Sequence, residues 1–430
     1  MSENGKKKYA LVGCGSRARF FYESVASTYS KTSEMVAFCD ISPTRMNFAN
    51  AQLQKCGAAA VPTYKHTDFE KMINEVRPDY VIVTTVDRNH DYYIIKAMEM
   101  GVDVITEKPM TIDEEKAQNI IDTQKRTGRS LLVTFNYRYA PHNTKIRELI
   151  MNDTIGDVLS IHFEWLLDTK HGADYFRRWH RNKHNSGGLL VHKSTHHFDL
   201  VNFWLADTPR RVFAMGDLMF YGMKNAEKRG VTEFYDRAYG NPAAKNDPFA
   251  IDIEGEEEMK AMYLDAESDS GYVRDRSVFS DDIAIEDVMG VLVRYNKGTI
   301  LTYSLNTFLP WEGFNVVFNG TKGRIELKVV ERSYVSGKDS IVHQGATDKE
   351  NLMVYPQFAE PYKVEIIRGE GGHGGGDPVL LNDIFGVPEP DKFNRAASHV
   401  DGAMSILTGV AANKSIASGL PVDIATLVKF

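Results

Sequence analysis

The sequence predicts an α/β domain built on a parallel sheet, followed by an α+β domain with a large, mostly antiparallel open sheet. The chain has 430 residues, more than one ordinary hydrophobic core accommodates, so two domains are expected. Strand-like and helix-like segments alternate over roughly the first 135 residues, which is typical of βαβ units. Beyond residue 205 strand-like segments dominate, and glycine-containing turns join several of them, as in antiparallel hairpins.

The N-terminal part, residues 1–137, opens with the strand-like run KYALVGCG, the helical segment SRARFFYESVAST and a second strand-like run, EMVAFCD. The next segment, SPTRMNFANAQLQKCG, predicts a helix with Ser42 at its cap, Pro43 at its first position and Gly57 at its end. The alternation continues as far as SLLVTFNY. The strand-like runs are rich in Val, Ile and Tyr, as expected when both faces of a parallel sheet are covered.

The C-terminal part, residues 138–430, has a different character. A helix is predicted over 140–153 and a long strand over 157–168. Further strands are expected over 210–222, 287–296 and 298–308, with a hairpin over 314–330.

Three other segments of this part stand apart. Residues 222–286 are charged and poorly periodic, which indicates a long insertion that either edges a pocket or forms a solvated surface excursion. The glycine-rich segment 369–378, which contains His373, predicts a flexible loop. A helix ended by Gly419 is expected near the C-terminus.

Composition and charge narrow the function classes. The net charge is −7 and no tract is rich in Lys or Arg, so no nucleic-acid partner is expected. The N-terminus lacks the apolar region of a signal peptide, and no apolar run is long enough to span a membrane. The three cysteines all lie within the first 60 residues and are expected to be reduced thiols. A cytoplasmic protein without membrane association is therefore expected.

The stretch VGCGSRA, residues 12–18, lies between the first strand and the first helix. Gly13 and Gly15 suit a tight turn that lets backbone approach a pyrophosphate, and the free N–H groups of the following helix attract the same anion. Ala18 stands at the third position of the G-x-G-x-x-G fingerprint, where alanine is permitted. We expect a Rossmann dinucleotide-binding domain, with Gly13, Gly15, Ser16, Arg17 and Ala18 holding the cofactor.

Asp40 ends the second predicted strand. An acid there can hydrogen-bond the adenosine ribose hydroxyls and repels a 2′-phosphate, so NAD is the expected cofactor. NADP stays the alternative because Arg17 and Arg45 lie close in sequence.

A lysine follows the predicted strand DVIT in the sequence Glu107-Lys108-Pro109. Ligands of open parallel sheets bind beyond the carboxyl ends of the strands, so Lys108 is expected to face the cofactor. Pro109 stops the strand and restricts Lys108 to an extended backbone.

Three histidines crowd into the stretch HKSTHH, as His192, His196 and His197. The four-residue spacing of His192 and His196 is compatible with zinc, with His373 or Asp199 as a further ligand, but the H-E-x-x-H motif is absent. Ser194 and Thr195 are poor candidates for a hydrolase nucleophile because no G-x-S-x-G elbow surrounds them. Proton transfer by a neutral imidazole is the favoured interpretation, without a metal. For His197 packing within the helix is preferred.

Taken together, these motifs resemble the Gfo/Idh/MocA oxidoreductases, named for glucose–fructose oxidoreductase and inositol dehydrogenase. The resemblance spans nearly the whole chain and rests on VGCGSRA, Asp40, TTVDRNH, EKP, NYRYAP, SGGLLVHKSTHHFDL, GTKGRIEL and SILTGVAANKSI. It implies an NAD(P)-dependent oxidoreductase with a sugar, glycoside or cyclitol substrate. It also implies a homodimer or homotetramer assembled through the open sheet.

The resemblance assigns roles residue by residue. Lys108 matches the catalytic lysine, and His196 matches the catalytic histidine of G-G-x-x-x-D-x-x-x-H. His192 stands where most members carry aspartate, a departure that bears on the proton relay or the substrate. The resemblance also implies cofactor contacts for Thr84, Thr85, His90, Glu107 and Arg138, although Val86 replaces the proline of the T-P-x-x-x-H segment.

The expected reaction follows from these roles. His196 takes a hydroxyl proton, Lys108 stabilises the developing alkoxide, and His192 orients both or shares the proton. Tyr137, Trp179 and Arg181 are expected walls for the sugar. Two alternatives stay open: an enzyme that cleaves a glycoside by transient oxidation and elimination with NAD kept bound, and a non-catalytic sensor of NAD and sugar.

Overall fold

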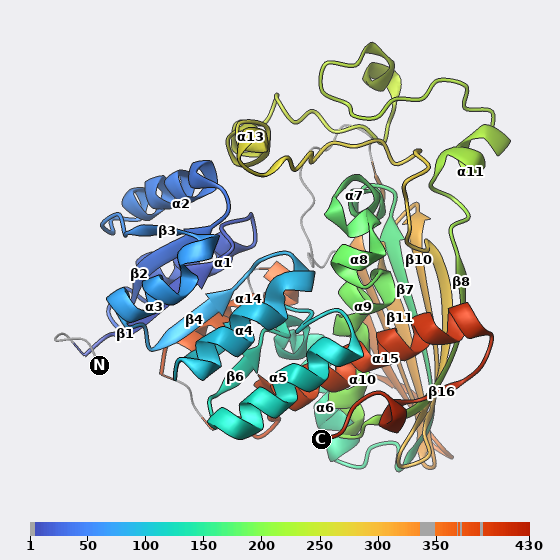
Figure 1. Cartoon of the computed structure of the whole chain (residues 1–430). Helices are drawn as coiled ribbons and strands as arrows, with labels where there is room; N and C mark the ends of the chain where they lie inside the picture. Colours follow the sequence, from blue (N-terminus) through green and yellow to red (C-terminus); the bar gives the residue numbers. More distant parts are fainter. Residues whose placement is uncertain (1–4, 336–348, 368, 370–371, 388–389) are drawn as a thin grey trace.

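The computed structural model describes residues 5–335, 349–367, 369, 372–387 and 390–430. Two sheets organise these residues, and a group of helices lies between them (Figure 1). The first sheet belongs to the N-terminal part, and the second, drawn edge-on in Figure 1, belongs to the C-terminal part. Both predicted sheet types are confirmed.

The first sheet has the strand order β15-β6-β5-β4-β1-β2-β3. All its pairs are parallel except β15 with β6. Its strands are β1 Lys7–Val12, β2 Ser33–Asp40, β3 Thr63–Lys65, β4 Tyr80–Val83, β5 Asp103–Thr106, β6 Leu131–Val133 and β15 Ala397–Ser398. The helices that alternate with them are α1 Ala18–Ala26, α2 Pro43–Lys55, α3 Phe69–Val76, α4 His90–Glu99 and α5 Glu114–Thr127.

Local signals in the sequence account for these elements. The side chain of Ser42 accepts a hydrogen bond from the N–H of Arg45, and Pro43 occupies the first turn, so α2 begins where its cap predicted. Asp113 caps α5 in the same way, and Gly128 ends it in a left-handed conformation. Strand β1 is buried from Tyr9 to Val12, as a strand covered on both faces should be.

The second sheet has the order β14-β13-β12-β11-β7-β10-β9-β8-β16 and is antiparallel except for the pair β7 and β10. Its strands are β7 Val158–Asp168, β8 Pro209–Asp217, β9 Val288–Tyr295, β10 Ile300–Leu309, β11 Glu312–Gly320, β12 Gly323–Arg332, β13 Lys349–Pro356, β14 Tyr362–Lys363 and β16 Val422–Asp423. Buried and exposed residues alternate along β9, so one face of the sheet packs on the core and the other is open.

Strand β8 is shorter than the predicted strand over 210–222. It ends at Asp217, because the buried carboxylate of Asp287 accepts hydrogen bonds from the N–H groups of Met219, Phe220 and Tyr221. These bonds take the amides that would otherwise continue the ladder, and the chain leaves the sheet.

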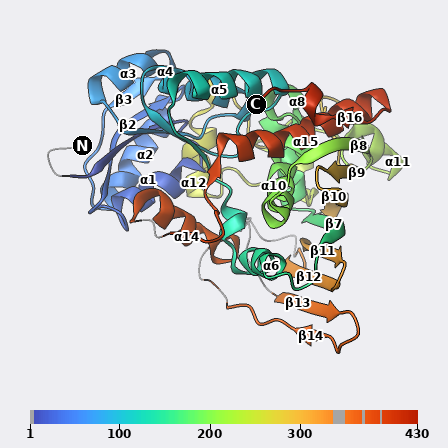
Figure 2. The same ribbon diagram turned by 90° about the horizontal axis from the view of Figure 1, so that it is seen from below.

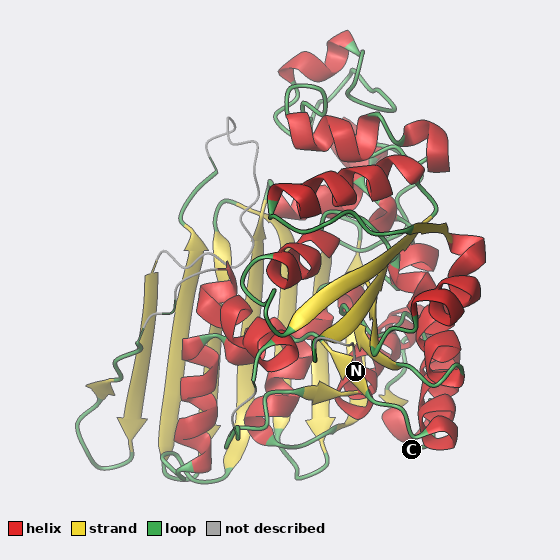
Figure 3. Cartoon of the chain, turned by 90° about the vertical axis from the view of Figure 1, so that its left-hand side faces the viewer, coloured by secondary structure: helices red, strands yellow, loops and turns green. Residues whose placement is uncertain are grey.

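The packed face of the second sheet is covered by helices (Figures 2 and 3). Helix α15 contacts β8, α9 and α10 on one side and α5 and β6 on the other, so it joins the two sheets. The helices of this part are α6 Pro141–Met151, α7 His171–Arg177, α8 Lys183–Ser186, α9 Leu189–His192, α10 Ser194–Leu205 and α15 His399–Ser418.

The insertion over 222–286 is more than a solvated excursion. It carries α11 Met223–Lys228, α12 Glu257–Met259 and α13 Glu267–Ser270, and it reaches toward the N-terminal part above the helices (Figure 1). There the hydroxyl of Ser42 donates to Asp269 at 2.5 Å, and Nε of Arg45 donates to the carbonyl of Met262 at 3.0 Å. The insertion therefore touches the start of α2, beside the predicted cofactor site.

The prediction of a flexible loop over 369–378 is wrong for most of that segment. Helix α14, Gly372–Phe385, starts within it, and the side chain of His373 lies outside the described residues. Leu380 and Phe385 bury in the core around β1, where the rings of Phe385 and Tyr9 meet edge to face. These contacts stabilise a helix that glycine content alone disfavours.

The C-terminal part thus returns to the first sheet through α14, β15 and α15. The predicted division at residue 137 assigns β15 to the second domain, whereas its partner strand β6 lies in the first. Among the described residues, none of the helices combines the length and the apolar character needed to cross a membrane.

Candidate active site

A cavity of about 730 Å³ lies where the carboxyl ends of β1, β2, β4 and β5 face α9, α10 and the insertion. One end is lined by Gly13, Gly15, Asp40 and Arg45, and the other by Lys108, Trp179, His180, His192 and His196. Strand ends of an open parallel sheet are the usual ligand site of such folds.

The glycine loop forms one wall of the cavity. Gly13 has a φ of +95°, and a Cβ there would lie 2.6 Å from the backbone of Thr84 and Thr85, so only glycine fits. A Cβ on Gly15 would project into open space. Ser16 and Arg17 also line the cavity, whereas Ala18 is fully buried as the first residue of α1 and does not. This cradle fits the pyrophosphate of a dinucleotide.

Asp40 lies at the end of β2 and lines the same wall. Its two carboxylate oxygens accept from the N–H groups of Cys14, at 2.5 Å, and Ser42, at 2.7 Å. Burial raises its pKa, and these backbone bonds partly offset that effect. The bonds fix the carboxylate at the position where an acid of this fold meets a ribose diol.

The insertion supplies lining residues that the sequence did not indicate: Tyr263, Ser270 and Tyr272. The guanidinium of Arg45 lies 5.6 Å from the ring centre of Tyr263 and 5.8 Å from that of Tyr272. Tyrosines in a charged, poorly periodic segment carry no positional signal, so only the tertiary contacts reveal them. The adenosine end of the cavity is thus built by two distant parts of the chain.

Thr84, Thr85 and His90, of the stretch TTVDRNH, line the middle of the cavity, and their contacts with a cofactor stay a prediction. The hydroxyl of Thr84 donates to the carbonyl of Gly13 at 2.6 Å. The ring nitrogens of His90 lie 2.8 Å from the carbonyl of Pro109 and 3.0 Å from that of Thr85. Burial lowers the pKa of His90, and the two carbonyls oppose that effect; as a neutral ring it donates to one of the two carbonyls.

Lys108 projects from the end of β5 into the cavity. Its neighbour Glu107 is held by Arg17, whose Nε lies 2.6 Å from the carboxylate. The ammonium of Lys108 donates to the carbonyl of His192 at 3.4 Å. Burial lowers the pKa of Lys108 to about 8, against the opposing charges of Glu107 and Asp87.

The histidine stretch is divided between two helices. His192 ends α9 and His196 lies in the first turn of α10, and both line the cavity. His196 packs edge-on against Tyr137, with ring centres 4.9 Å apart. His197 is turned into the core, stacked on Trp165 at 3.9 Å with Nδ1 2.6 Å from the hydroxyl of Tyr303. The structure thus separates His197 from the cavity.

His192 has a close partner that the sequence reasoning missed. Its Nδ1 lies 2.5 Å from a carboxylate oxygen of Asp87, which also lines the cavity. Its ring lies 4.1 Å from that of His180, which stacks on Trp179 at 3.6 Å. Asp87 belongs to TTVDRNH, but nothing in that stretch indicates a contact with a residue 105 positions away.

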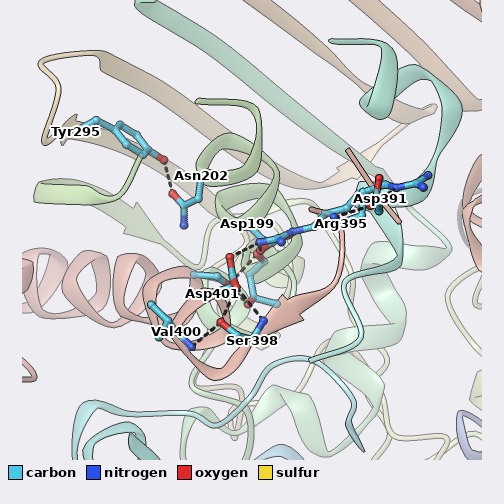
Figure 4. A network of polar contacts seen from close by, with 11 residues as sticks. Asp199, Asn202, Tyr295, Asp391, Arg395, Ser398, Val400 and Asp401 are labelled. Atoms are coloured by element: carbon cyan, nitrogen blue, oxygen red, sulfur yellow. Dashed lines mark hydrogen bonds and ion pairs between the residues drawn. The ribbon is translucent and has the colours of Figure 1, made fainter. Parts of the chain in front are cut away.

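Besides Ala18, three predicted contact residues do not line the cavity. Arg138 is buried, where its guanidinium pairs with Asp199 and Asp401, two acids that are labelled in Figure 4. Tyr137 lies behind His196 and donates to Glu331 at 3.1 Å. Arg181 pairs with Asp282 of the insertion at 2.6 Å. Each of these three residues is paired with an acid that is distant in sequence, so no local pattern indicated the pairing.

Among the described residues, no group of three His, Cys, Asp or Glu side chains could hold a metal ion. This absence does not test the expectation that no metal takes part in the reaction, which stays a prediction.

Two family models match the chain. Residues 7–135 match the NAD-binding Rossmann fold of the oxidoreductase family GFO_IDH_MocA, and residues 147–424 match that family's C-terminal alpha/beta domain. The chain belongs to the Gfo/Idh/MocA oxidoreductase family. As a member it has the NAD-binding Rossmann domain and the C-terminal alpha/beta domain of an oxidoreductase family.

Relatives of this family member cover different shares of the chain. "Putative oxidoreductase YteT" of Bacillus subtilis (strain 168) is 35% identical over 98% of both chains. The D-glucoside 3-dehydrogenase of Escherichia coli (strain K12) is 31% identical over 35% of this chain and 41% of its own length. The solved structure of an oxidoreductase from Agrobacterium radiobacter, in complex with NAD+, L-tartaric acid and magnesium, has a TM-score of 0.65 at 17% identity. It covers 98% of this chain and all of that one, and the likeness shows the shared fold.

Proposed function

We propose that this family member is an NAD-dependent dehydrogenase that oxidises a secondary alcohol of a sugar, glycoside or cyclitol. The observation that carries the proposal is the placement of Lys108, His192 and His196 around one end of a cavity whose other end has a dinucleotide cradle. The similarity to a D-glucoside 3-dehydrogenase supports the substrate class.

His196 and Lys108 have separate roles in the proposed reaction. The bound nicotinamide ring supplies the hydride acceptor. His196 takes the proton of the substrate hydroxyl as general base, and the ammonium of Lys108 donates a hydrogen bond to the oxygen as negative charge develops on it. The buried position of Lys108 strengthens that hydrogen bond, because little water competes for it.

Trp179 and His180 form a stacked pair on the substrate side of the cavity. The apolar face of a sugar ring can pack on such a surface. Arg178 lines the same side and adds a donor for hydroxyl groups. Arg178 thus takes, in this proposal, the place that the sequence suggested for Arg181.

We propose NAD rather than NADP as the cofactor because the carboxylate of Asp40 stands at the ribose position. A 2′-phosphate there would meet a fixed negative charge. Arg45 lines the cavity nearby but already donates to the carbonyl of Met262 and faces two tyrosine rings.

We also propose a homodimer or homotetramer in which the open face of the second sheet is covered. Met215, Leu292 and Ile300 are exposed large apolar residues of that face. Contiguous apolar surface of this kind is typical of an interface between copies. Light scattering of the purified protein should give a mass above that of one chain.

A second function has one observation in its favour. Cleavage of a glycoside by transient oxidation and elimination requires a further base near the carbon beside the carbonyl, and His192 offers an imidazole there. In that case NAD is reduced and then reoxidised within each turnover, so no net NADH forms. A sensor would bind NAD and sugar without any turnover.

One experiment separates the three. The purified protein is first checked for co-purifying cofactor and then mixed with added NAD and a panel of sugars, glycosides and cyclitols while nicotinamide absorbance is followed. Sustained NADH formation with any sugar, glycoside or cyclitol of the panel supports the dehydrogenase. Release of free sugar from a glycoside without net NADH formation supports elimination, and neither signal supports the sensor.

A further inference from the structure

Asp87 and His192 come from the two halves of the molecule. Asp87 follows β4 of the first sheet, and His192 ends helix α9 beside the second. Their side chains meet at the floor of the cavity, with Nδ1 2.5 Å from the carboxylate, and both residues are more than 90% buried. So short a contact between buried groups fixes the orientation of the imidazole ring.

The chemistry of the pair selects one tautomer. Burial raises the pKa of Asp87, while the positive charges of Lys108 and Arg178 lower it and favour the ionised carboxylate. An ionised carboxylate only accepts hydrogen bonds, so Nδ1 of His192 then carries the proton and donates it to Asp87. Nε2 is then left with a lone pair, and His192 lines the cavity. The ring as a whole is neutral, because burial and the nearby cations hold the pKa of His192 well below its usual range.

Several groups of other elements face this pair. Lys108 and His90 lie on the side of the first sheet, and Tyr175, Arg178, His180 and Lys193 lie on the side of α7 to α10. Most of these groups are cations or neutral rings. Glu107 and Asp87 are the carboxylates that oppose them, and the negative charges of both raise the pKa of Lys108.

This arrangement explains how the chain tolerates histidine at position 192. The family pattern places an aspartate there, next to the catalytic lysine. Here the carboxylate stands one side chain further back, at residue 87, and the imidazole of His192 is interposed between it and the cavity. The negative charge near Lys108 is conserved, while the group that meets the substrate is changed from a carboxylate to an imidazole.

We propose that Asp87 is a positioning residue: it holds His192 as the Nδ1–H tautomer with Nε2 toward the substrate, and it supplies the carboxylate that stabilises the Lys108 ammonium. The effect on turnover rests on the proposed dehydrogenase function. The tautomer itself does not depend on that function.

The kinetic test uses Asp87→Asn in the full-length protein with saturating NAD. An amide can donate to Nδ1 and so select the opposite tautomer, and we expect kcat to fall by about 10²–10⁴, the range for an acid that orients a catalytic imidazole. NAD affinity should change little. Asp91→Asn is the matched control, because Asp91 pairs with Lys116 outside the cavity, and it should retain wild-type kcat.

A second variant moves the charge instead of removing it. In Asp87→Asn with His192→Asp the carboxylate returns to the position of the family pattern. We expect this double variant to recover at least tenfold of the kcat lost in Asp87→Asn alone. The alkaline limb of the pH profile should move to lower pH in Asp87→Asn, because Lys108 loses an opposing charge, and should move back in the double variant. A purely structural role for Asp87 would not move that limb.

The tautomer is measured without turnover. ¹⁵N-histidine spectra of the wild-type protein saturated with NAD, assigned with a His192→Gln variant, should show His192 neutral and protonated on Nδ1 across neutral pH. A proton on Nε2, or an imidazolium, would overturn the proposal even if every variant lost activity. So would wild-type kcat in Asp87→Asn, or a double variant no faster than the single one. If the wild-type protein oxidises no sugar, the proposed function fails, and the spectra still decide the role of Asp87.

Discussion

The two ends of the cavity are built in different ways. The adenosine end rests on Gly13, Gly15 and Asp40, which lie within one βαβ unit and are spaced as the motif requires. The reacting end joins Lys108, from a strand end of the first sheet, to His192 and His196, from helices of the second part. In the proposed function, one contiguous stretch of chain thus supplies most of the cofactor contacts, to which the insertion adds Tyr263, whereas every contact to the substrate depends on segments that are distant in sequence.

The largest effect should come from the reacting end. His196→Ala is expected to lower kcat by about 10²–10⁴, the scale for a lost general base, with NAD affinity nearly unchanged. His197→Ala is the matched control on the same helix, because His197 stacks on Trp165 in the core. It should lower the melting temperature and leave kcat near wild type. Steady-state kinetics and thermal denaturation of both variants check this contrast, and equal losses of kcat would remove the distinction.

Lys108→Met should lower kcat somewhat less than His196→Ala does. Loss of one donor to a developing oxyanion lowers kcat by about 10²–10³, while the cradle for NAD stays in place. Binding titrations with NAD and steady-state kinetics measure the two quantities separately. If NAD affinity and kcat fell together, Lys108 would belong to the cofactor end of the cavity.

The dependence of kcat/KM on pH tests whether Lys108 acts in its protonated form. Burial lowers the pKa of Lys108 to about 8, and the charged form is the donor, so kcat/KM for oxidation should fall as the pH rises through about 8. The pKa of His192 is lowered by burial as well, so its own titration should leave the profile flat around neutral pH. A rate that climbs through pH 8 would instead make neutral Lys108 the base.

Substitutions at the adenosine end should have smaller effects on turnover and should alter the preference for NAD over NADP. Asp40→Ala removes charged hydrogen bonds worth about 1.5–3 kcal/mol and the repulsion of a 2′-phosphate. The ratio of kcat/KM for NAD to that for NADP should therefore fall by about 10-fold to 150-fold. A wild-type preference for NADP would contradict the role of Asp40.

The smallest effect concerns the insertion. Tyr263→Ala opens one wall of the cofactor site and should speed NAD release by several-fold, with kcat for a saturated enzyme little changed. Tyr239→Ala, at an exposed residue of the same insertion that does not line the cavity, is the control. Stopped-flow displacement of bound NADH measures both, and equal release rates would separate the insertion from the cofactor.

Much of the fold could be predicted because the signals were local. The cap at Ser42 and the alternation of strands and helices define the first domain, and glycine turns define the hairpins. Helix α14 could not be predicted, since its glycines argue against a helix and only the burial of Leu380 and Phe385 favours it.

The site residues also differ in whether local sequence could predict them. Gly13 and Lys108 come just after strands and Asp40 ends one, so their positions at the strand ends could be predicted from the sequence. Asp87 and Tyr263 could not, because their partners lie far away along the chain. Arg138 was misplaced for the same reason: its partner Asp199 is 61 residues further on and holds it in the core.

The central claim is that carbon-bound hydrogen of a sugar-type alcohol is transferred to the cofactor at the end of the cavity that carries Lys108 and His196. Its most direct test incubates the NAD-loaded protein with carbon-deuterated substrates of the panel and examines the reduced cofactor by mass spectrometry. The account predicts deuterium in the nicotinamide ring with the wild-type protein and far slower transfer with Lys108→Met. A reduced cofactor free of deuterium, or equal transfer by both proteins, would contradict it.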